Sequence, residues 1–175
     1  YNNVPCVGHA NAKVAQAMHQ QLQTLNVHSR YLHEDILEYA ERLTALHSSS
    51  IESVVFSCSG TEANEVAMNM ARIATKGKAF ICTNAAYHGN SNQVGQLTYV
   101  PIGDRNRKNT YSIPYPQKFR PIVSGLNEEE LSREYLKTLE AVIEQINEDG
   151  IELAGILFCP IFANEGLPDI PEGYM

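Results

Sequence analysis

The chain has 175 residues, 43% of them hydrophobic, and a formal net charge of −7. This acidic balance argues against nucleic acid as the main partner, because neutralising phosphates requires a basic surface. No apolar run approaches the roughly 20 residues that a membrane span needs, and no basic-plus-apolar signal segment opens the chain. We therefore expect a globular protein that binds neither nucleic acid nor membrane.

The cysteines and histidines show no metal-ligand spacing. The cysteines are scattered without a C-x-x-C pair, which favours a reduced, cytoplasmic protein over a disulfide scaffold or a zinc site. Four of the histidines have no suitably spaced carboxylate or cysteine, so we expect them at surface or interface positions and predict no metal site. These residues are Cys6, Cys58, Cys82 and Cys159, and His19, His28, His33 and His47.

Two helices are predicted at the front of the chain. Asn11 can cap a helix with apolar residues along one side, and a second helix is expected from about Leu32 to His47. Ser48–Ser50 then resembles a linker. We expect residues 1–47 to form a leading helical segment and residues 48–175 to belong to a larger domain.

A strand, a small-residue turn and a helix are predicted from Val54 to Lys76. The apolar, β-rich run at 54–58 predicts a buried strand, and apolar residues at helical spacing follow the turn. The start of a helix presents unpaired N–H groups and a positive dipole end, which can hold a phosphate. There Gly60 would allow close approach and Thr61 would add a hydroxyl group. Ser59 and Glu62 also fit a capping box, which needs no ligand, so both interpretations stay open.

The next predicted strand, at 79–83, completes a βαβ unit with parallel strands and a right-handed crossover. The segment NAAYHGN follows at its carboxyl end, where ligands bind in open α/β sheets. In this segment Tyr87 offers a flat face for a ring, and His88 offers a group that titrates near neutral pH. The alternative is a loop with an aromatic anchor.

The rest of the chain continues the alternation of helices and strands. Residues 99–124 contain four prolines and predict irregular structure; their basic residues suit a solvated loop or, alternatively, a substrate-phosphate site. Asn127 and Glu130 form a capping-box pattern before a helix that Gly150 ends, and a third strand is expected over Leu153–Phe158. The fold class is therefore α/β, with a mainly parallel sheet, flanking helices and two helices ahead of it.

Several motifs together resemble one family. SGTEAN, AYHG and ILFCPI followed by PEGY resemble class III aminotransferases, the fold-type-I enzymes that use pyridoxal 5'-phosphate. The opening, NNVPCVGH and then LNVHSRYLHEDILEYAERL, is similar to the branch that contains alanine–glyoxylate aminotransferase and ethanolamine-phosphate phospho-lyase. The resemblance implies that Gly60 and Thr61 bind the cofactor phosphate, that Tyr87 stacks on the pyridine ring, and that His88 lies beside it.

The resemblance also implies an activity and partners. The full-length protein would transfer an amino group from an amino acid or amine to a keto acid, and it would be a homodimer whose leading helices lie in the smaller domain near the subunit interface. An alternative within enzymes is a phospho-lyase acting on a phosphorylated amino alcohol. A third alternative is a non-catalytic domain that keeps this fold for binding or assembly.

Two departures from the family pattern stand out. Cys159 occupies a position before proline where the family normally has a glutamate, which puts the inherited substrate preference in doubt. The family's aspartate that pairs with the pyridine nitrogen, and the lysine that bonds the cofactor, do not occur before Met175. Because the chain also begins at Tyr1 without an initiator methionine, we expect a piece of a longer polypeptide. Without the family's later strands, we expect exposed apolar surface that rearrangement, swapping or dimerisation would cover.

The absence of the family's lysine motif predicts that this 175-residue chain alone is catalytically silent and binds the cofactor weakly or not at all. Lys76, Lys78, Lys108, Lys118 and Lys137 all lie in surface or loop contexts. Mixing the chain with pyridoxal phosphate and borohydride should therefore give no stable pyridoxyl adduct at a unique lysine. Mass spectrometry of the digested product measures this, and one specifically modified lysine would contradict the prediction.

Overall fold

The structure is a computed structural model that describes residues 5–28, 30–99 and 107–175. The chain divides into two compact units, Tyr1–Phe56 and Ser57–Met175. The first is helical and the second contains the sheet. No helix among the described residues is both long and apolar enough to cross a bilayer.

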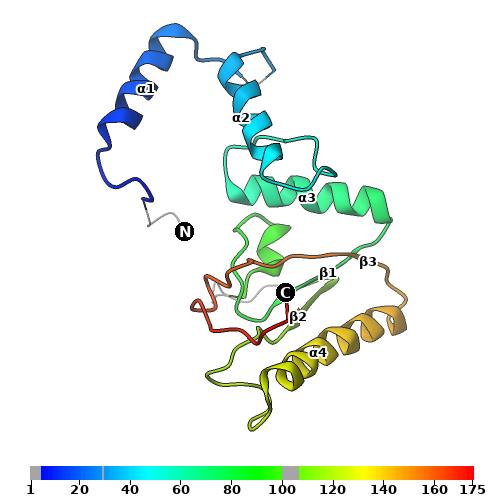
Figure 1. Cartoon of the computed structure of the whole chain (residues 1–175). Helices are drawn as coiled ribbons and strands as arrows, with labels where there is room; N and C mark the ends of the chain where they lie inside the picture. The colour runs from blue at the N-terminus through cyan, green and yellow to red at the C-terminus, as the bar shows by residue number, and fades with distance from the viewer. Residues whose placement is uncertain (1–4, 29, 100–106) are drawn as a thin grey trace. The chain divides into compact units, whose positions relative to one another are not determined.

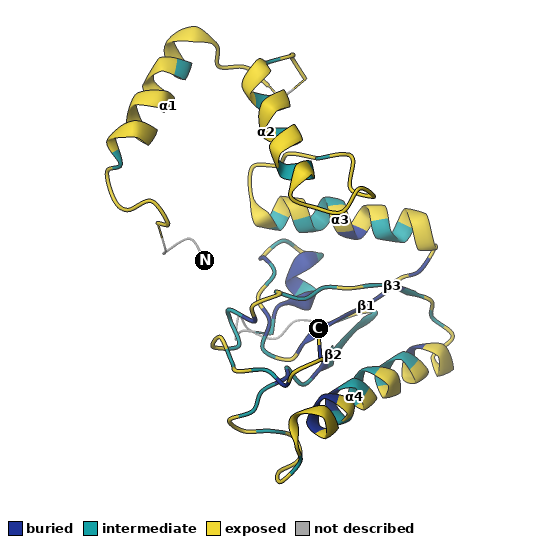
Figure 2. Cartoon of the chain, viewed as in Figure 1, coloured by how far each residue is buried: buried dark blue, intermediate teal, exposed yellow. Residues whose placement is uncertain are grey.

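The first unit consists of α1 (Ala12–Thr24), α2 (Glu34–Ala45) and the segments around them. The predicted cap of α1 is confirmed, since the Asn11 side chain accepts hydrogen bonds from the Lys13 and Val14 N–H groups at 3.1 and 3.2 Å. His33 caps α2 by accepting from the Asp35 N–H at 3.2 Å, a structural role that its spacing did not reveal. Neither helix contains a buried residue, and both are coloured mostly as exposed in Figure 2.

The prediction of a strand at 54–58 is wrong. Residues 51–57 have no regular secondary structure, and none of the three described strands pairs with them. A β-rich composition does not make a strand unless a neighbouring strand satisfies its backbone N–H and C=O groups. Val55 stays 63% exposed, and the Phe56 ring instead stacks on Tyr39 with centroids 5.5 Å apart. The predicted βαβ unit is therefore not formed through this segment.

The second unit is built on a parallel sheet that has three strands among the described residues. Its strands are β1 (Ala79–Thr83), β2 (Thr110–Ile113) and β3 (Leu153–Ile156), in the order β2-β1-β3. All five residues of β1 are buried. A central parallel strand covered on both faces needs a continuous apolar run, which is the pattern that predicted β1 from sequence.

Helices cover both faces of this sheet, α3 (Gly60–Thr75) on one side and α4 (Glu128–Glu148) on the other (Figure 1). Alternate residues of β1 point to opposite faces. Phe80 and Cys82 pack with Met68 of α3, whereas Ala79 and Ile81 pack with Ile146 of α4. The second unit is thus a three-layer arrangement with β1 at its centre.

Both flanking helices begin near where the sequence predicts. Asn127 and Glu130 form both reciprocal bonds of the capping box at the start of α4, at 2.9 and 3.0 Å. The apolar residues that predicted α3 lie mostly on its exposed side, where Met70 is 58% exposed. The sheet-facing side of α3 instead combines Met68 with polar residues that bind the segment after β1.

Two short elements escaped prediction. The strand β2 lies inside the proline-containing region expected to be irregular, and its four residues TYSI carry little hydrophobic signal. The 3-10 helix η1 (Val94–Leu97) follows the predicted ligand loop and is dark blue in Figure 2, with Val94 and Leu97 fully buried. The third strand is confirmed but ends at Ile156 instead of Phe158.

Candidate functional site

The first turn of α3 leaves two backbone donors free. Ser59 caps the helix, because its Oγ accepts from the Glu62 N–H at 3.1 Å and its carbonyl from the Ala63 N–H at 3.0 Å. The Glu62 carboxylate accepts from the Cys58 N–H at 2.7 Å instead of the Ser59 N–H that a full capping box requires. The N–H groups of Gly60 and Thr61 have no acceptor among the described residues. Capping and anion binding are therefore compatible here, since they use different N–H groups.

The loop after β1 packs directly against this turn. The Asn64 side chain donates from Nδ2 to the His88 carbonyl at 2.7 Å. Gly89 comes so close to α3 that an added Cβ would lie 2.6 Å from Thr61 Oγ1. Its φ of +145° also favours glycine. The two stretches that the sequence singled out separately, SGTEAN and AYHG, thus form one surface.

The buried Thr98 hydroxyl forms hydrogen bonds to the backbone of this loop. Thr98 Oγ1 donates to the Gly89 carbonyl at 2.7 Å and accepts from the His88 N–H at 3.2 Å. Next to it, the Tyr99 N–H donates to the Ala86 carbonyl at 2.7 Å. These bonds fix the backbone on both sides of Tyr87, so the loop presents its side chains from a rigid support.

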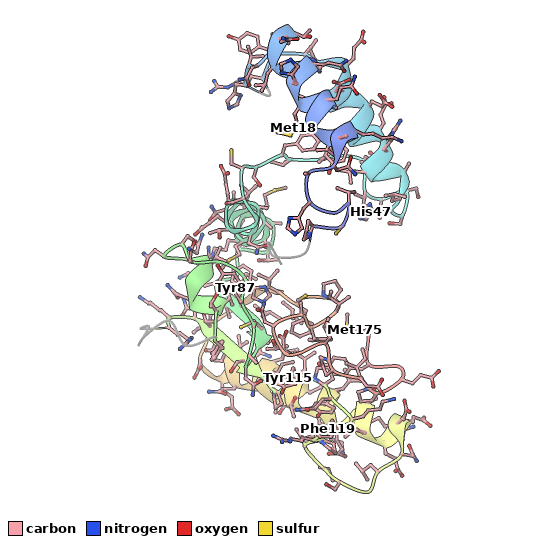
Figure 3. The ribbon with its side chains drawn as sticks, turned by 90° about the vertical axis from the view of Figure 1, so that its left-hand side faces the viewer. Met18, His47, Tyr87, Tyr115, Phe119 and Met175 are labelled. Carbon is pink, nitrogen blue, oxygen red and sulfur yellow. The ribbon has the colours of Figure 1, made fainter. Side chains whose placement is uncertain are left out.

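Tyr87 and His88 differ sharply in environment. The Tyr87 ring, labelled in Figure 3, is 41% exposed, while its carbonyl accepts from Asn164 Nδ2 at 3.3 Å. The His88 ring is half-buried, and its Nε2 atom has neither solvent contact nor a hydrogen-bond partner. Burial lowers the pKa of His88 below its ordinary value, although the Glu165 charge and a bond to the Leu157 backbone act in the opposite direction. Tyr87 therefore offers an open aromatic face and His88 a largely neutral ring at pH 7.

Glu65 joins α3 to the segment before η1. Its carboxylate accepts from the Ser91 hydroxyl and the Gln93 side chain, and from the Val94 N–H at 3.4 Å. Burial raises the pKa of Glu65, but these hydrogen bonds outweigh it, so the pKa lies below its ordinary value. Glu65 thus holds the far end of the loop in its ionised form.

The basic stretch at 99–124 serves structure where it is described. Arg107 stacks on the Tyr99 ring at 4.0 Å and donates to the Gln96 and Thr98 carbonyls at 3.2 and 2.8 Å. Lys118 pairs with Glu128 and Asp169 at 3.1 and 2.9 Å. Arg105 lies outside the described residues. The alternative of a substrate-phosphate site here gains no support from these contacts.

The cysteines near the site are structural in character. Cys82 is fully buried in β1, and burial raises the pKa of its thiol to about 12, which removes its reactivity at neutral pH. Cys159, at the position where the resemblance implies a glutamate, accepts from the Ala163 N–H at 3.5 Å through its sulfur. This contact shapes the turn after β3.

A family model settles which proteins the chain is related to. The model described as aminotransferase class-III matches residues 3–175. The chain belongs to the class III aminotransferase family. Family membership confirms the resemblance that the SGTEAN, AYHG and PEGY motifs indicated.

Individual class III relatives agree with this assignment. The Drosophila melanogaster protein named alanine–glyoxylate aminotransferase 2-like is 34% identical over 97 residues, which is 55% of this chain and 20% of that protein. Acetylornithine aminotransferase from Methanosarcina mazei is 31% identical over 171 residues, which is 97% of this chain and 38% of that protein. A solved phospholyase from Arthrobacter, in complex with phosphoethanolamine, has a TM-score of 0.87 at 34% identity and covers 99% of this chain. The chain covers 41% of that structure, so it spans less than half the length of these relatives.

The close approach of Gly89 to α3 predicts a specific effect of substitution. Gly89→Ala should lower the free energy of unfolding by about 1–3 kcal/mol, because the methyl group overlaps Thr61 Oγ1 and the backbone φ is unfavourable. Urea unfolding measures this. Gly60→Ala is the matched control, since a Cβ there meets no atom within 4 Å, and it should leave stability nearly unchanged. Equal losses in the two variants would contradict the predicted contact.

The lowered pKa of Glu65 predicts a pH-dependent contribution to stability. An acid whose folded pKa is depressed stabilises the fold above its unfolded pKa, and the contribution is lost as pH falls through the folded value. Glu65→Gln should therefore cost about 1–2 kcal/mol at neutral pH, and this cost should shrink as the pH is lowered through the folded pKa. Urea unfolding at a series of pH values from neutral into the acid range tests this, with Glu144→Gln on the exposed side of α4 as the control. A pH-independent difference would show that the carboxylate charge is not involved.

Proposed function

We propose that this chain contributes the phosphate-binding turn and the ring-stacking loop of a pyridoxal-phosphate-dependent aminotransferase. The observation that carries the proposal is the contact between Asn64 and His88, which docks the Tyr87 loop on the start of α3. This contact places two free N–H groups, a hydroxyl and an exposed aromatic ring on neighbouring segments of one unit.

The residues fit the coenzyme's phosphate group. Gly60 has open space where a Cβ would lie, and its N–H and that of Thr61 are unpaired among the described residues. Both lie at the positive end of α3, a 16-residue helix. A phosphate dianion would accept hydrogen bonds from these groups and from the Thr61 hydroxyl, and the helix dipole would favour its charge.

The residues also fit an aromatic ring above the loop. Tyr87 would cover one face of the pyridine ring, because its side chain is exposed while its backbone is fixed by Asn164 and Thr98. Offset stacking of two rings typically contributes about 0.5–1.5 kcal/mol beyond the area buried. When bound, pyridoxal phosphate supplies a ring that withdraws electrons from the carbon bearing the amino group. This chain's own residues bind the phosphate, orient the ring and keep water from one of its faces.

In the full-length protein, we propose transfer of an amino group from an amino acid or amine to a keto acid, in a homodimer. The alternative is elimination from a phosphorylated amino alcohol, and the 34% identity to the Arthrobacter phospholyase is the observation that supports it. The equal identity to the alanine–glyoxylate aminotransferase 2-like protein supports transamination as well. The two are distinguished by their products. Accumulation of pyridoxamine phosphate from an amino donor alone would establish transamination, whereas release of phosphate without a keto acid would establish elimination.

Coenzyme affinity of the full-length protein tests the proposed site. Thr61→Val should weaken pyridoxal phosphate binding about 10-fold or more, because it removes one hydrogen bond to a charged group. Tyr87→Ala should also weaken binding by removing the stacking face. The matched control is Thr138→Val, whose hydroxyl donates to the Tyr135 carbonyl within α4. Titration followed by coenzyme absorbance measures all three, and an unchanged affinity in both Thr61→Val and Tyr87→Ala would overturn the proposal.

A further inference from the structure

One guanidinium group contacts both of the residues that hold the Tyr87 loop. Arg107 Nη2 donates to the Thr98 carbonyl at 2.8 Å, and the guanidinium carbon lies 4.0 Å from the centre of the Tyr99 ring. Arg107 Nε also donates to the Gln96 carbonyl at 3.2 Å. Arg107 thus binds the end of η1 and the two residues after it through two hydrogen bonds and one cation–π contact.

Thr98 and Tyr99 in turn bind the loop on both sides of Tyr87. Thr98 Oγ1 accepts a hydrogen bond from the His88 N–H at 3.2 Å. The Tyr99 N–H donates to the Ala86 carbonyl at 2.7 Å. Ala86 precedes Tyr87 in the chain, and His88 follows it. A single side chain therefore holds both of the residues that fix the backbone presenting the aromatic ring.

The carbonyls that Arg107 binds need a donor from outside η1. Only 1% of Thr98 is exposed, so its carbonyl is shielded from solvent, and an unpaired buried carbonyl is costly. In the part of the chain that the structure describes, the Arg107 side chain is the one donor to the Gln96 and Thr98 carbonyls. Loss of this side chain would leave both carbonyls without a protein partner.

The positive charge of Arg107 is directed to these contacts. No carboxylate among the described residues forms an ion pair with it, whereas Lys118, Arg133 and Lys137 in the same unit each pair with one. Hydrogen bonds from a charged donor are roughly twice as strong as those between neutral groups. Arg107 is therefore a strong donor whose partners are the two carbonyls and the ring.

We infer that Arg107 is a positioning residue for the Tyr87 ring. Its guanidinium group fixes Thr98 and Tyr99, and these two residues fix the loop backbone on either side of Tyr87. The stacking face is thereby presented from a rigid backbone before the coenzyme binds, which lowers the cost of ordering it. This inference rests on the proposed function, since it names a further residue on which ring stacking depends. Arg107 acts through Tyr87 and not by contact with the coenzyme.

Lysine cannot reproduce the contacts of Arg107. The planar guanidinium group donates from two nitrogens to two carbonyls while its carbon lies over the Tyr99 ring. An ammonium group is a single point charge without this fixed geometry. Arg107→Lys therefore keeps the charge and removes the geometry, so it tests positioning and not net charge.

Coenzyme titration of the full-length protein tests this role. Arg107→Lys should weaken pyridoxal phosphate binding about 3- to 10-fold, because part of the lost bonding free energy reaches the stacking ring. In a Tyr87→Ala background the same substitution should have almost no further effect, because the ring through which it acts is gone. Arg133→Lys changes an exposed arginine that pairs with Glu129 within α4, and it should leave the affinity unchanged.

Exchange of backbone amide hydrogens, measured by mass spectrometry without coenzyme, tests the contacts themselves. In Arg107→Lys, peptides that contain the His88 amide should exchange about 10-fold faster, because their acceptor on Thr98 is less firmly held. Peptides from α4 should be unchanged. If Arg107→Lys does not fold, two variants of Tyr99 replace it. Tyr99→Phe keeps the ring that Arg107 covers and should bind coenzyme more tightly than Tyr99→Leu, which removes it.

The inference is overturned by an unchanged coenzyme affinity in Arg107→Lys, by an equal loss of affinity in the Tyr87→Ala background, or by unchanged exchange at His88. Equal affinities of Tyr99→Phe and Tyr99→Leu would overturn it as well. Loss of affinity in Thr61→Val and Tyr87→Ala, without loss in Arg107→Lys, would leave the proposed function standing. If the unsubstituted protein binds no coenzyme, the proposed function fails, and hydrogen exchange still decides whether Arg107 holds the loop.

Discussion

The hydrogen bond from Asn64 to the His88 carbonyl is the contact on which the account of the site depends. It joins the second turn of α3 to the loop at the carboxyl end of the central strand, two places 24 residues apart in sequence. A helix start alone is a common structural feature, and so is an exposed tyrosine in a loop. Joined by this bond and by the close approach of Gly89 to Thr61, they form one surface with a helix start at one end and an exposed aromatic ring at the other. We propose that the helix start binds an anion.

Other contacts in the second unit fix the two segments that this hydrogen bond joins. β1 is buried on both faces, so its carboxyl end is fixed between α3 and α4. Thr98 binds the loop backbone from η1, and Glu65 binds the segment that leads into η1. Most of the polar groups around the loop are paired, and His88 Nε2 is an exception. Satisfied networks of this kind hold a loop in one conformation, which a binding site requires.

Elements with strong local signals could be predicted from the sequence. The capping box at Asn127, the cap at Asn11 and the apolar run of β1 each depend on neighbouring residues alone. The strand at 54–58 failed because strand formation depends on a partner that local sequence does not specify. The strand β2 was not predicted for the same reason. Its four residues form a strand because they pair with β1, and local sequence does not specify that pairing.

The arrangement of the candidate site was predictable in part. Motifs singled out Gly60, Thr61, Tyr87 and His88 as candidates, and the structure brings the two motifs together. Asn64 stands inside SGTEAN, so its position was visible although its role was not. Thr98 and Glu165 carried no signal, because their contacts to the loop and to β1 come from tertiary folding. Asn164 could not be predicted for the same reason, because its hydrogen bond to the Tyr87 carbonyl joins residues 77 positions apart in sequence.

A crystal structure of the full-length protein with pyridoxal phosphate tests the central claim most directly. The account predicts the phosphate within hydrogen-bonding distance of the Gly60 and Thr61 N–H groups, with the Tyr87 ring stacked on the pyridine ring. A phosphate bound away from the start of α3, or a pyridine ring with Tyr87 turned away from it, would contradict it.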